Sequence, residues 1–508
     1  ASDVLTDLDA AVPSGPARPR AAGRRPLVAA VALVAVIAAS ALFVTRDRRA
    51  ATAAEASIAV LPFLNLSEEE QQYFSDGVTE EILNALARID GLRVPARTSS
   101  FHFRDRDLPV REIAEQLRVA HVLEGSVRRD GEDVRITATL VDARTERRLW
   151  SETFEAESRD VFDVQRRIAD AVAAALELRL APGAARADGA PAVAAAHDLY
   201  LQGLFHWNRR SRAELLNAIR LFEEAVAVDS AYARAWGGLA LAYAAGIASI
   251  PPLLADTPLL PRVEAAAQRA LALDSTLAEP HAALGYAYHW QWRWADAERE
   301  LRRALVLNPS WASALHWYGE HLAKIGRGEE AESWLRRAIA LDPFALVLQS
   351  DLGLVLAHDG RVSEAIAQYE RARERDPGFV IPHLMLHRLY LVRGDIEESV
   401  EAGRRWAELS TAADAVELAT LARAKTDPEL RSAALAILDR WETGPAPFWP
   451  DIALYATQLG EHERALDALE QALRQRMPML ANLRQASWFE PLHGHPRYER
   501  LIAALRFP

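Results

Sequence analysis

The feature that most constrains this chain is a 34-residue spacing that recurs in the C-terminal half of its 508 residues. Five series of glycines, alanines and prolines keep this spacing in one phase. The series are Gly285, Gly319 and Gly353; Ala297, Ala331 and Ala365; Ala304, Ala338 and Ala372; Pro309, Pro343 and Pro377; and Gly326, Gly360 and Gly394. A fixed period of this length predicts a stack of similar units, each in contact with its neighbours.

Thirty-four residues is the period of the tetratricopeptide (TPR) repeat, a helix–turn–helix unit. The small residues are expected where the two helices of a unit approach closely. Gly326 and Gly360 are expected just after the first helix of their units, where a left-handed residue costs least for glycine. Because one unit cannot bury its apolar face alone, the units should stack into a superhelical solenoid with a concave groove.

The repeat phase sets the expected boundaries of the C-terminal half. Residues 181–196 are rich in alanine, glycine and proline and are predicted to be a linker. Residues 197–479 should form the TPR solenoid, with about seven to eight helix pairs and an insertion near residues 246–261. Residues 480–508 are expected to cap the last pair, since such arrays need a terminal cap.

TPR arrays usually hold a protein or peptide in the concave groove, so a protein partner is expected here. Exposed aromatic side chains near the turn of the third repeat would suggest an interaction hot spot. The alternative for these tryptophans is packing within and between repeats. The candidate partner-binding residues are His281, Tyr288, Trp290, Trp292, His316 and Gln349.

The N-terminal part begins with a polar tail, residues 1–25, that is predicted to be disordered. Residues 26–45 follow as an apolar run flanked by arginines, and their length suits a transmembrane helix. A buried core helix or a cleaved signal peptide are the alternatives. Four arginines precede this run and three follow it, and the more basic side of a membrane span usually faces the cytoplasm. This weakly favours a cytoplasmic N-terminus, with the remaining domains outside the bacterial inner membrane. The membrane is therefore an expected partner of residues 26–45.

Residues 56–180 have the pattern of a small α/β domain. Short β-branched runs predict strands at residues 57–63, 92–95, 119–127, 134–142 and 149–154. Helical spacing of apolar residues predicts helices at residues 73–89, 110–117 and 161–180. The predicted fold class is thus mainly α: one transmembrane helix, a small α/β domain, then an all-α TPR superhelical solenoid.

Five ordered motifs in this domain carry a family resemblance. They are Ile58–Ser67 (IAVLPFLNLS), Tyr73–Glu81 (YFSDGVTEE), Ala96–Phe101 (ARTSSF), Val122–Arg128 (VLEGSVR) and Leu149–Glu152 (LWSE). Together they resemble the N-terminal domain of TolB and the FlgO family. The resemblance implies a non-enzymatic domain. In relatives it follows a membrane span, downstream of a kinase, an adenylate cyclase or a CadC-like DNA-binding domain.

Two of these motifs offer candidate ligand-binding loops. Ser75, Asp76 and Gly77 could open a helix and bind an anion through free backbone N–H groups. An ordinary N-cap and turn is the alternative. The second loop, Arg97, Thr98 and Ser99, follows a predicted strand and could donate hydrogen bonds to a ligand or fix the loop itself.

Composition excludes several kinds of chemistry. The chain has no cysteine, which excludes thiolate catalysis and disulfides. It contains no phosphate-binding glycine-rich loop, zinc-protease motif or nucleophile elbow. We therefore expect no catalytic residues, no cofactor and no metal site. A net charge of −12 speaks against a nucleic-acid partner.

The expected function is protein–protein interaction by a non-catalytic, membrane-anchored scaffold or sensor. The alternative is the regulatory C-terminal half of a signalling enzyme or transcription regulator, with its effector domain upstream of Ala1. An α/β domain that is itself an enzyme is the least favoured hypothesis, because the motifs for it are missing. The sequence leaves the partner and the oligomeric state open.

Overall fold

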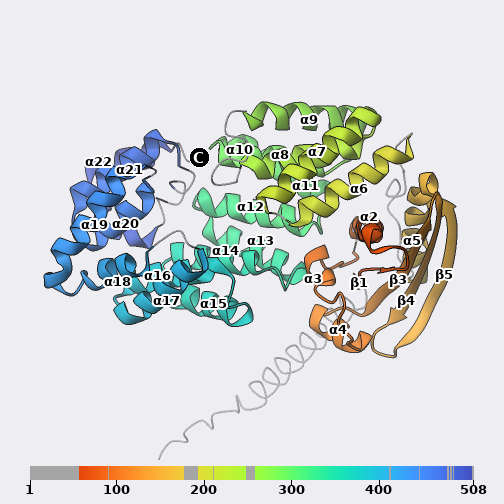
Figure 1. The fold of residues 1–508 in the computed structure, drawn as a ribbon, viewed down its shortest axis with the longest axis horizontal. Coiled ribbons are helices and arrows are strands. Elements are labelled where there is room, and N and C mark those ends of the chain that lie inside the picture. The colour runs from red at the N-terminus through yellow and green to blue at the C-terminus, as the bar shows by residue number, and fades with distance from the viewer. Residues whose placement is uncertain are drawn as a thin grey trace, which may run out of the picture. The chain divides into compact units, whose positions relative to one another are not determined.

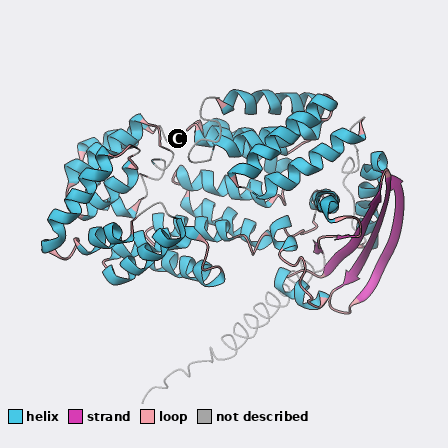
Figure 2. Cartoon of the chain, in the orientation of Figure 1, coloured by secondary structure: helices cyan, strands magenta, loops and turns pink. Residues whose placement is uncertain are grey.

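The computed structural model describes residues 57–505, except residues 90, 177–192, 210, 248–257, 411–413, 446, 478–479, 481–482 and 484–485. These residues belong to one compact unit. A sheet with its helices comes first along the chain, and paired helices follow to the C-terminus (Figures 1 and 2).

The sequence predicts a transmembrane helix at residues 26–45, and the inner-membrane location and the membrane partner rest on it. That segment lies outside the described residues. Among the residues that the structure describes, no helix combines the length and the apolar character needed to cross a bilayer. The fold class is therefore corrected to a mainly helical chain with a small sheet and a TPR-type solenoid, and the inner-membrane location is withdrawn.

The sheet contains five strands among the described residues, in the order β1-β3-β4-β5, with β2 also paired to β3. The strands are β1 (Ile58–Val60), β2 (Leu64–Asn65), β3 (His121–Asp130), β4 (Asp133–Asp142) and β5 (Arg147–Glu157). β1 and β2 run parallel to β3, and β3 to β5 form an antiparallel meander. The predicted strand at residues 92–95 is reduced to one bridge between Arg93 and Ser57.

Helices cover both faces of this sheet because side chains alternate along each strand. On one face, Ile58 and Val60 join a core with α2 (Gln72–Ala87) and α5 (Val161–Ala175). On the other face, Ala59 packs in a smaller cluster with α4 (Val110–Leu117). The short helix α3 (Arg97–Phe101) lies between α2 and α4 along the chain.

The described part of the solenoid consists of eight helix pairs. They are α6 (Ala194–Arg209) and α7 (Arg212–Val228), α8 (Ala233–Ile247) and α9 (Leu259–Leu273), α10 (Glu279–Trp290) and α11 (Trp294–Leu307), α12 (Ala312–Lys324) and α13 (Gly328–Leu341), α14 (Leu346–His358) and α15 (Val362–Arg375), α16 (Val380–Arg393) and α17 (Ile396–Ser410), α18 (Ala415–Arg423) and α19 (Arg431–Thr443), and α20 (Trp449–Gln458) and α21 (His462–Arg474). The single turns η1 (Glu69–Gln71), η2 (Ser158–Asp160) and η3 (Pro428–Leu430) precede α2, α5 and α19. The terminal elements are η5 (Ser487–Leu492) and α22 (Pro496–Ala504).

Glycines let the helices of three successive pairs approach closely. A glycine of the first helix faces a large side chain of the second, and a Cβ at the glycine would come too close to it. A Cβ at Gly285 would lie 2.6 Å from the side chain of Leu301. The corresponding distances are 2.9 Å from Gly319 to Leu335 and 2.8 Å from Gly353 to Tyr369. This confirms the role expected for this glycine series, because contacts under 3 Å leave no room for a side chain.

Left-handed residues form the turn inside each of the third to fifth repeats, and a series of ion pairs connects each of these repeats to the one before it. Gly326 and Gly360 follow their first helices with φ of 86° and 75°, as predicted, and Trp292 takes the equivalent place in the third repeat with φ of 60°. The turn arginine of each unit pairs with a glutamate of the preceding second helix. These pairs are Arg293–Glu264 at 3.1 Å, Arg327–Glu298 at 2.7 Å and Arg361–Glu332 at 2.6 Å.

The C-terminal elements pack back onto earlier repeats. The indole Nε1 of Trp294, at the start of α11, donates a hydrogen bond to the carbonyl of Leu505 at 3.0 Å. The ring of His358 on α14 packs edge-on against Trp488 in η5, with ring centres 5.8 Å apart. Residues after α21 therefore contact the third and fifth helix pairs as well as their own neighbours.

Candidate functional site

The α/β domain is attached to the first repeats through α2. Gly77 lies against α6, since a Cβ at this position would be 2.6 Å from Leu201. The buried carboxylate of Glu81 accepts a hydrogen bond from the hydroxyl of Tyr200 at 3.2 Å and pairs with Arg234 of α8. A buried ion pair is strongly destabilising to break from one side, so this contact ties the two parts together.

A second attachment joins α3 to the turn between α13 and α14. The backbone N–H of Ala96 donates to the carbonyl of Leu341 at 2.7 Å. The hydroxyl of Ser99 donates to Oδ1 of Asp342 at 2.5 Å and accepts from the N–H of Phe344 at 3.1 Å. The ring of His102 stacks on Phe344 with centres 4.1 Å apart. The α/β domain thus meets the solenoid at the first two pairs and again at the fourth to fifth pairs.

Between these two attachments lies a chamber of about 660 Å³. Its walls come from α2 and α3 on one side and from α6, α10, α12, α14 and the turns beside them on the other. The aromatic residues in the walls are Trp207, Tyr286, Trp311, Trp317, Phe344 and Phe379, and the polar ones include Glu80, Asn84, Arg97, Thr98, Asn208, Asn308, His316 and Asp342. A volume in the range of roughly 300–1,000 Å³ with mainly apolar walls and a few polar groups is typical of ligand sites.

The polar groups on the α/β side are paired with one another. Arg97 lies 3.2 Å from Glu80 and 3.5 Å from Asp76, and Asp76 also pairs with Arg104. The amide of Asn208 donates to Glu80 at 2.8 Å. The two carboxylates and two guanidinium groups therefore balance in charge on this wall.

Asp342 differs from these groups, because its hydrogen bonds come from the hydroxyls of Ser99 and Thr98 and the backbone of Ser99, and it forms no ion pair among the described residues. It is 6% exposed. Burial raises the pKa of Asp342 to about 6, against hydrogen bonds from Ser99 and Thr98 and the nearby His316, which lower it. His316 itself lies 2.5 Å from Asp351. Among the described residues of the chamber, Asp342 is thus a buried carboxyl group without an ion-pair partner.

Of the six residues predicted to bind a partner, His316 lies in the chamber wall. The other five lie elsewhere on the described solenoid. Three of them have polar partners: His281 is 2.7 Å from Glu300, Tyr288 donates to Glu264 at 3.0 Å, and Gln349 accepts from Gln368. The two tryptophans pack against other side chains: Trp290 lies edge-on to Tyr286, and Trp292 contacts both large core clusters. Both tryptophans therefore have the packing contacts within the solenoid that the alternative interpretation expects.

The two predicted ligand loops have different outcomes. Ser75, Asp76 and Gly77 lie inside α2, which begins at Gln72 after the turn η1, so the prediction that they open a helix is wrong. All three are buried. Arg97, Thr98 and Ser99 form the first turn of α3; Arg97 and Thr98 line the chamber, and Ser99 holds Asp342.

The sequence pattern missed the aromatic part of the chamber. Tyr286 of α10 and Trp317 of α12 stack with ring centres 4.5 Å apart, and Trp311 packs against Trp317 at 6.1 Å. Phe344 comes from the turn before α14. The tryptophans are visible in the sequence, but no fixed spacing links them to the α/β domain, so only the docking of that domain identifies them.

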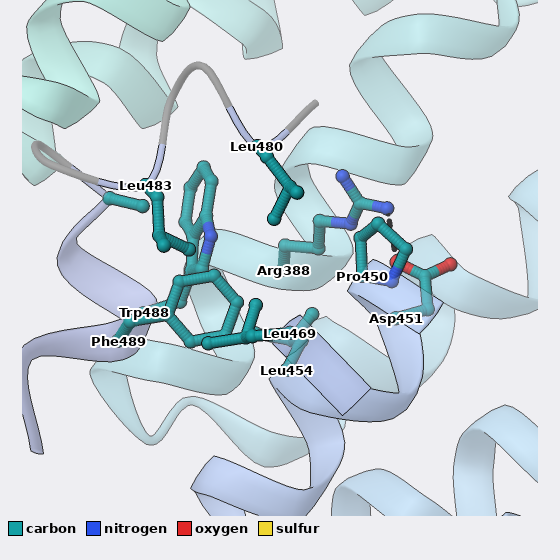
Figure 3. Close-up of a pocket in the computed structure, with 10 residues that line it drawn as sticks. Arg388, Pro450, Asp451, Leu454, Leu469, Leu480, Leu483, Trp488 and Phe489 are labelled. Carbon is teal, nitrogen blue, oxygen red and sulfur yellow. Dashed lines mark hydrogen bonds and ion pairs between the residues drawn. The ribbon is translucent and has the colours of Figure 1, made fainter. Parts of the chain in front are cut away.

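A second cavity, near the C-terminus, is too small to be a site. It measures about 30 Å³ and lies between α16, α20, α21 and the terminal segment (Figure 3). Arg388 and Asp451 pair at one end of it, and Leu480, Leu483 and Trp488 surround the other. This volume suits about one water molecule, so we assign these residues to packing of the cap.

Family comparisons agree with two parts of this structure. A tetratricopeptide repeat model matches residues 291–345 and 350–415. Together with the helix pairs, this shows a TPR-repeat protein. The second domain of HilA/YgeH-like transcriptional regulators matches residues 54–171. That match covers the α/β domain.

One curated relative is a protein of Rhizobium meliloti (strain 1021) with the provisional name adenylate cyclase 3. It is 33% identical over 252 residues, which are 48% of this chain and 42% of the relative. The chain thus spans less than half the length of this relative.

Solved TPR structures are also similar to parts of the chain. The TPR protein YrrB is 22% identical over 40% of this chain and 97% of its own, with a TM-score of 0.30. Pseudomonas aeruginosa PilF is 18% identical over 54% of this chain and 98% of its own, with a TM-score of 0.32. These low scores carry no argument about function.

Proposed function

We propose that this chain is a non-catalytic binding protein that recognises a segment of another protein in the chamber and on the solenoid surface beside it. TPR repeats support a protein partner, since stacked repeats form extended surfaces for one. The chamber is the observation that carries the proposal. It has a volume of about 660 Å³, and both the α/β domain and the solenoid contribute to its walls. A bound segment would therefore contact both parts of the protein.

Exposed apolar residues in the chamber wall, and close to it along the chain, support a bound segment longer than one side chain. Val347, at the start of α14, lines the chamber and is 40% exposed. Phe379 also lines it, and Ile381 follows two residues later at 38% exposure. Exposed apolar side chains next to a cavity are typical of interaction sites.

Site-specific photo-crosslinking tests the proposal. A photoreactive amino acid is placed at Val347 of the full chain in living cells, and crosslinked proteins are identified by mass spectrometry. We expect a discrete product at this position. A Val347→Glu/Ile381→Glu variant should reduce the recovery of the same partner at least about tenfold, because a charge would have to be buried against an apolar segment.

Exposed valines away from the chamber provide the matched control. Val306 on α11 is 69% exposed and Val416 on α18 is 75% exposed. The photoreactive group at these two positions should not give the Val347 product, and Val306→Glu should retain the partner. Equal crosslinking from all three positions would contradict the proposal.

The second candidate function is regulation of a signalling enzyme, in which the α/β domain transmits the occupancy of the solenoid. The likeness to the Rhizobium meliloti protein favours it. The resemblance of residues 56–180 to TolB and FlgO, and the HilA/YgeH-like match, fit the same hypothesis. A reading frame that joins this coding region to a cyclase, kinase or DNA-binding domain would support it.

Absence of catalysis is part of the proposal and is tested directly. The purified 508-residue chain is incubated with ATP and Mg²⁺, and cyclic AMP and released phosphate are measured. We expect neither product above a buffer blank. Product formation that a change in the chamber abolishes would make the chain an enzyme and overturn this part.

A further inference from the structure

The chamber has an uneven distribution of charge, and this distribution indicates which side chain fits. Glu80 and Arg97 pair with each other on the α/β wall, and Asp76 and Arg104 complete that group. Asp342, on the opposite wall, has Ser99 and Thr98 as hydrogen-bonding partners. Asp342 is 6% exposed and forms no ion pair among the described residues, whereas His316 in the same chamber wall pairs with Asp351. A buried carboxylate gains most from a cation that arrives with a ligand.

The rings in the chamber offer a surface for the stem of such a cation. Trp311, Trp317 and Phe344 line the same cavity as Asp342. Long basic side chains place their methylene groups on apolar surfaces, and aromatic faces attract ammonium and guanidinium groups. An acidic group among several aromatic rings therefore favours a cation over an anion or a neutral apolar group.

Asn308 gives an independent indication of an unfilled polar contact. It is the residue equivalent to Asp342 in the preceding repeat, 34 positions earlier, and it lines the same chamber. Asn308 is 5% exposed, and its Oδ1 has no hydrogen-bond partner among the described residues. Buried side-chain acceptors normally have a donor, and a basic side chain supplies several N–H groups.

We propose that the chamber is a specificity pocket for a lysine or arginine side chain of the bound partner segment, with Asp342 as the counter-ion and Trp311, Trp317 and Phe344 around the stem. This inference rests on the proposed function. It specifies that the partner presents a basic residue between apolar neighbours, which contact Val347 in the chamber wall and Ile381 beyond it.

Peptide selection on the immobilised 508-residue chain tests the proposal. A phage-displayed library of random peptides is panned, and the enriched peptides are synthesised. Each is compared with a version in which the lysine or arginine is replaced by norleucine, which keeps an apolar stem and removes the cation. We expect the norleucine version to bind at least about tenfold more weakly, which corresponds to one charge-assisted hydrogen bond.

Two matched variants assign this difference to Asp342. Asp342→Asn keeps the size of the side chain and an oxygen that can accept from Ser99, so the fold should persist. It should reduce the preference for the cation to about threefold or less. Asp376 occupies the same repeat position 34 residues later, is exposed, and accepts a hydrogen bond from the N–H of Gly378 at 2.9 Å. Asp376→Asn should keep the full preference.

The outcomes separate this inference from the proposed function. Enriched peptides without a preferred lysine or arginine, or an unchanged preference in Asp342→Asn, overturn the pocket but leave a peptide-binding protein. No enrichment of any peptide overturns both. N-acetyl-lysine methylamide that binds as tightly as the whole peptide would identify a free amine as the ligand and overturn the claim that a partner segment supplies the cation.

Discussion

The repeats built from α10 to α15 and the repeat built from α16 and α17 solve one packing problem with opposite residues. In the first group a glycine of the first helix receives a large side chain of the second, as at Gly319 and Leu335. In the later repeat the equivalent positions hold His387 and Gly403. A Cβ at Gly403 would lie 2.8 Å from Nδ1 of His387. The small and large partners have changed helices.

This difference shows that close packing constrains the pair of residues more than either position alone. The exchange also introduces polar atoms into the core. Nε2 of His387 lies 2.6 Å from the hydroxyl of Tyr455 on α20, and Nδ1 lies 2.9 Å from the carbonyl of Ser399. The histidine therefore links its own repeat to the last pair, which a glycine at this position could not do.

The largest expected effect is on the exchanged pair itself. Gly403→Leu should lower the free energy of unfolding by about 3 kcal/mol or more, because the new side chain overlaps the buried imidazole. The double variant His387→Gly/Gly403→Leu restores the arrangement of the earlier repeats. It should recover most of this loss and leave about 1–3 kcal/mol, because the hydroxyl of Tyr455 loses its partner.

Urea unfolding of the two single variants and the double variant measures this coupling. If the double variant is as unstable as the sum of the singles, the exchange is not compensatory and the comparison between the repeats fails.

The second expected effect is a pH dependence of the free energy of unfolding that comes from His387. The earlier repeats have a glycine at this position and so lack it. Burial lowers the pKa of His387 to about 4, whereas an unfolded histidine has a pKa of about 6.5. Between these values the unfolded chain binds a proton that the folded chain does not. Stability should therefore fall by about 3 kcal/mol as pH drops from about 6.5 to 4 through this residue.

His387→Gln removes the titrating group while keeping a polar side chain. The difference in unfolding free energy between this variant and the parent should shrink as pH falls, since only the parent carries this loss. Parallel stability curves from pH 7 to pH 4 would show that the histidine is not held neutral.

A smaller effect is expected at two adjacent glycines of α8. A Cβ at Gly238 would lie 2.7 Å from the ring of Phe222, whereas a Cβ at Gly237 would have ordinary contacts at 3.6 Å. Gly238→Ala should destabilise the protein by about 1–3 kcal/mol through overpacking. Gly237→Ala should stabilise it by about 0.5–1 kcal/mol through lower unfolded-state entropy.

Thermal unfolding of both alanine variants compares the neighbours directly. The same sign for both would mean that glycine is retained in α8 for a reason other than close helix packing.

The smallest effect is expected for the equivalent aspartates of successive repeats. The pKa of Asp342 is raised to about 6, so its ionised form destabilises the folded chain above that pH. Asp342→Asn should raise the unfolding free energy by about 1–2 kcal/mol at pH 7 and lose most of this advantage by about pH 4, where the unfolded parent is also becoming protonated.

Asp376→Asn should change stability by less than about 0.5 kcal/mol, because the side chain is exposed. Denaturant melts of both variants at the two pH values check the pair. A loss of stability in Asp342→Asn at pH 7 would indicate that the carboxylate already has a cationic partner.

The sequence by itself determined the repeating part of this protein. The 34-residue period predicts helix pairs, close contacts at Gly285, Gly319 and Gly353, and turns at Gly326 and Gly360. The structure has these features. Such features are local, because a unit meets only its neighbours and a residue's role follows from its place in the period.

Only the tertiary structure decided the candidate site. Ser99 and Asp342 are 243 residues apart and share a hydrogen bond, and Trp207 and Trp317 line one chamber although they belong to different repeats. No period connects α3 to the turn after α13, so spacing could not predict their contact. The prediction that Ser75, Asp76 and Gly77 open a helix is wrong because α2 begins three residues earlier, at Gln72. Their burial was not visible in the motif either, since it comes from packing against other elements, such as that of Gly77 on Leu201 of α6.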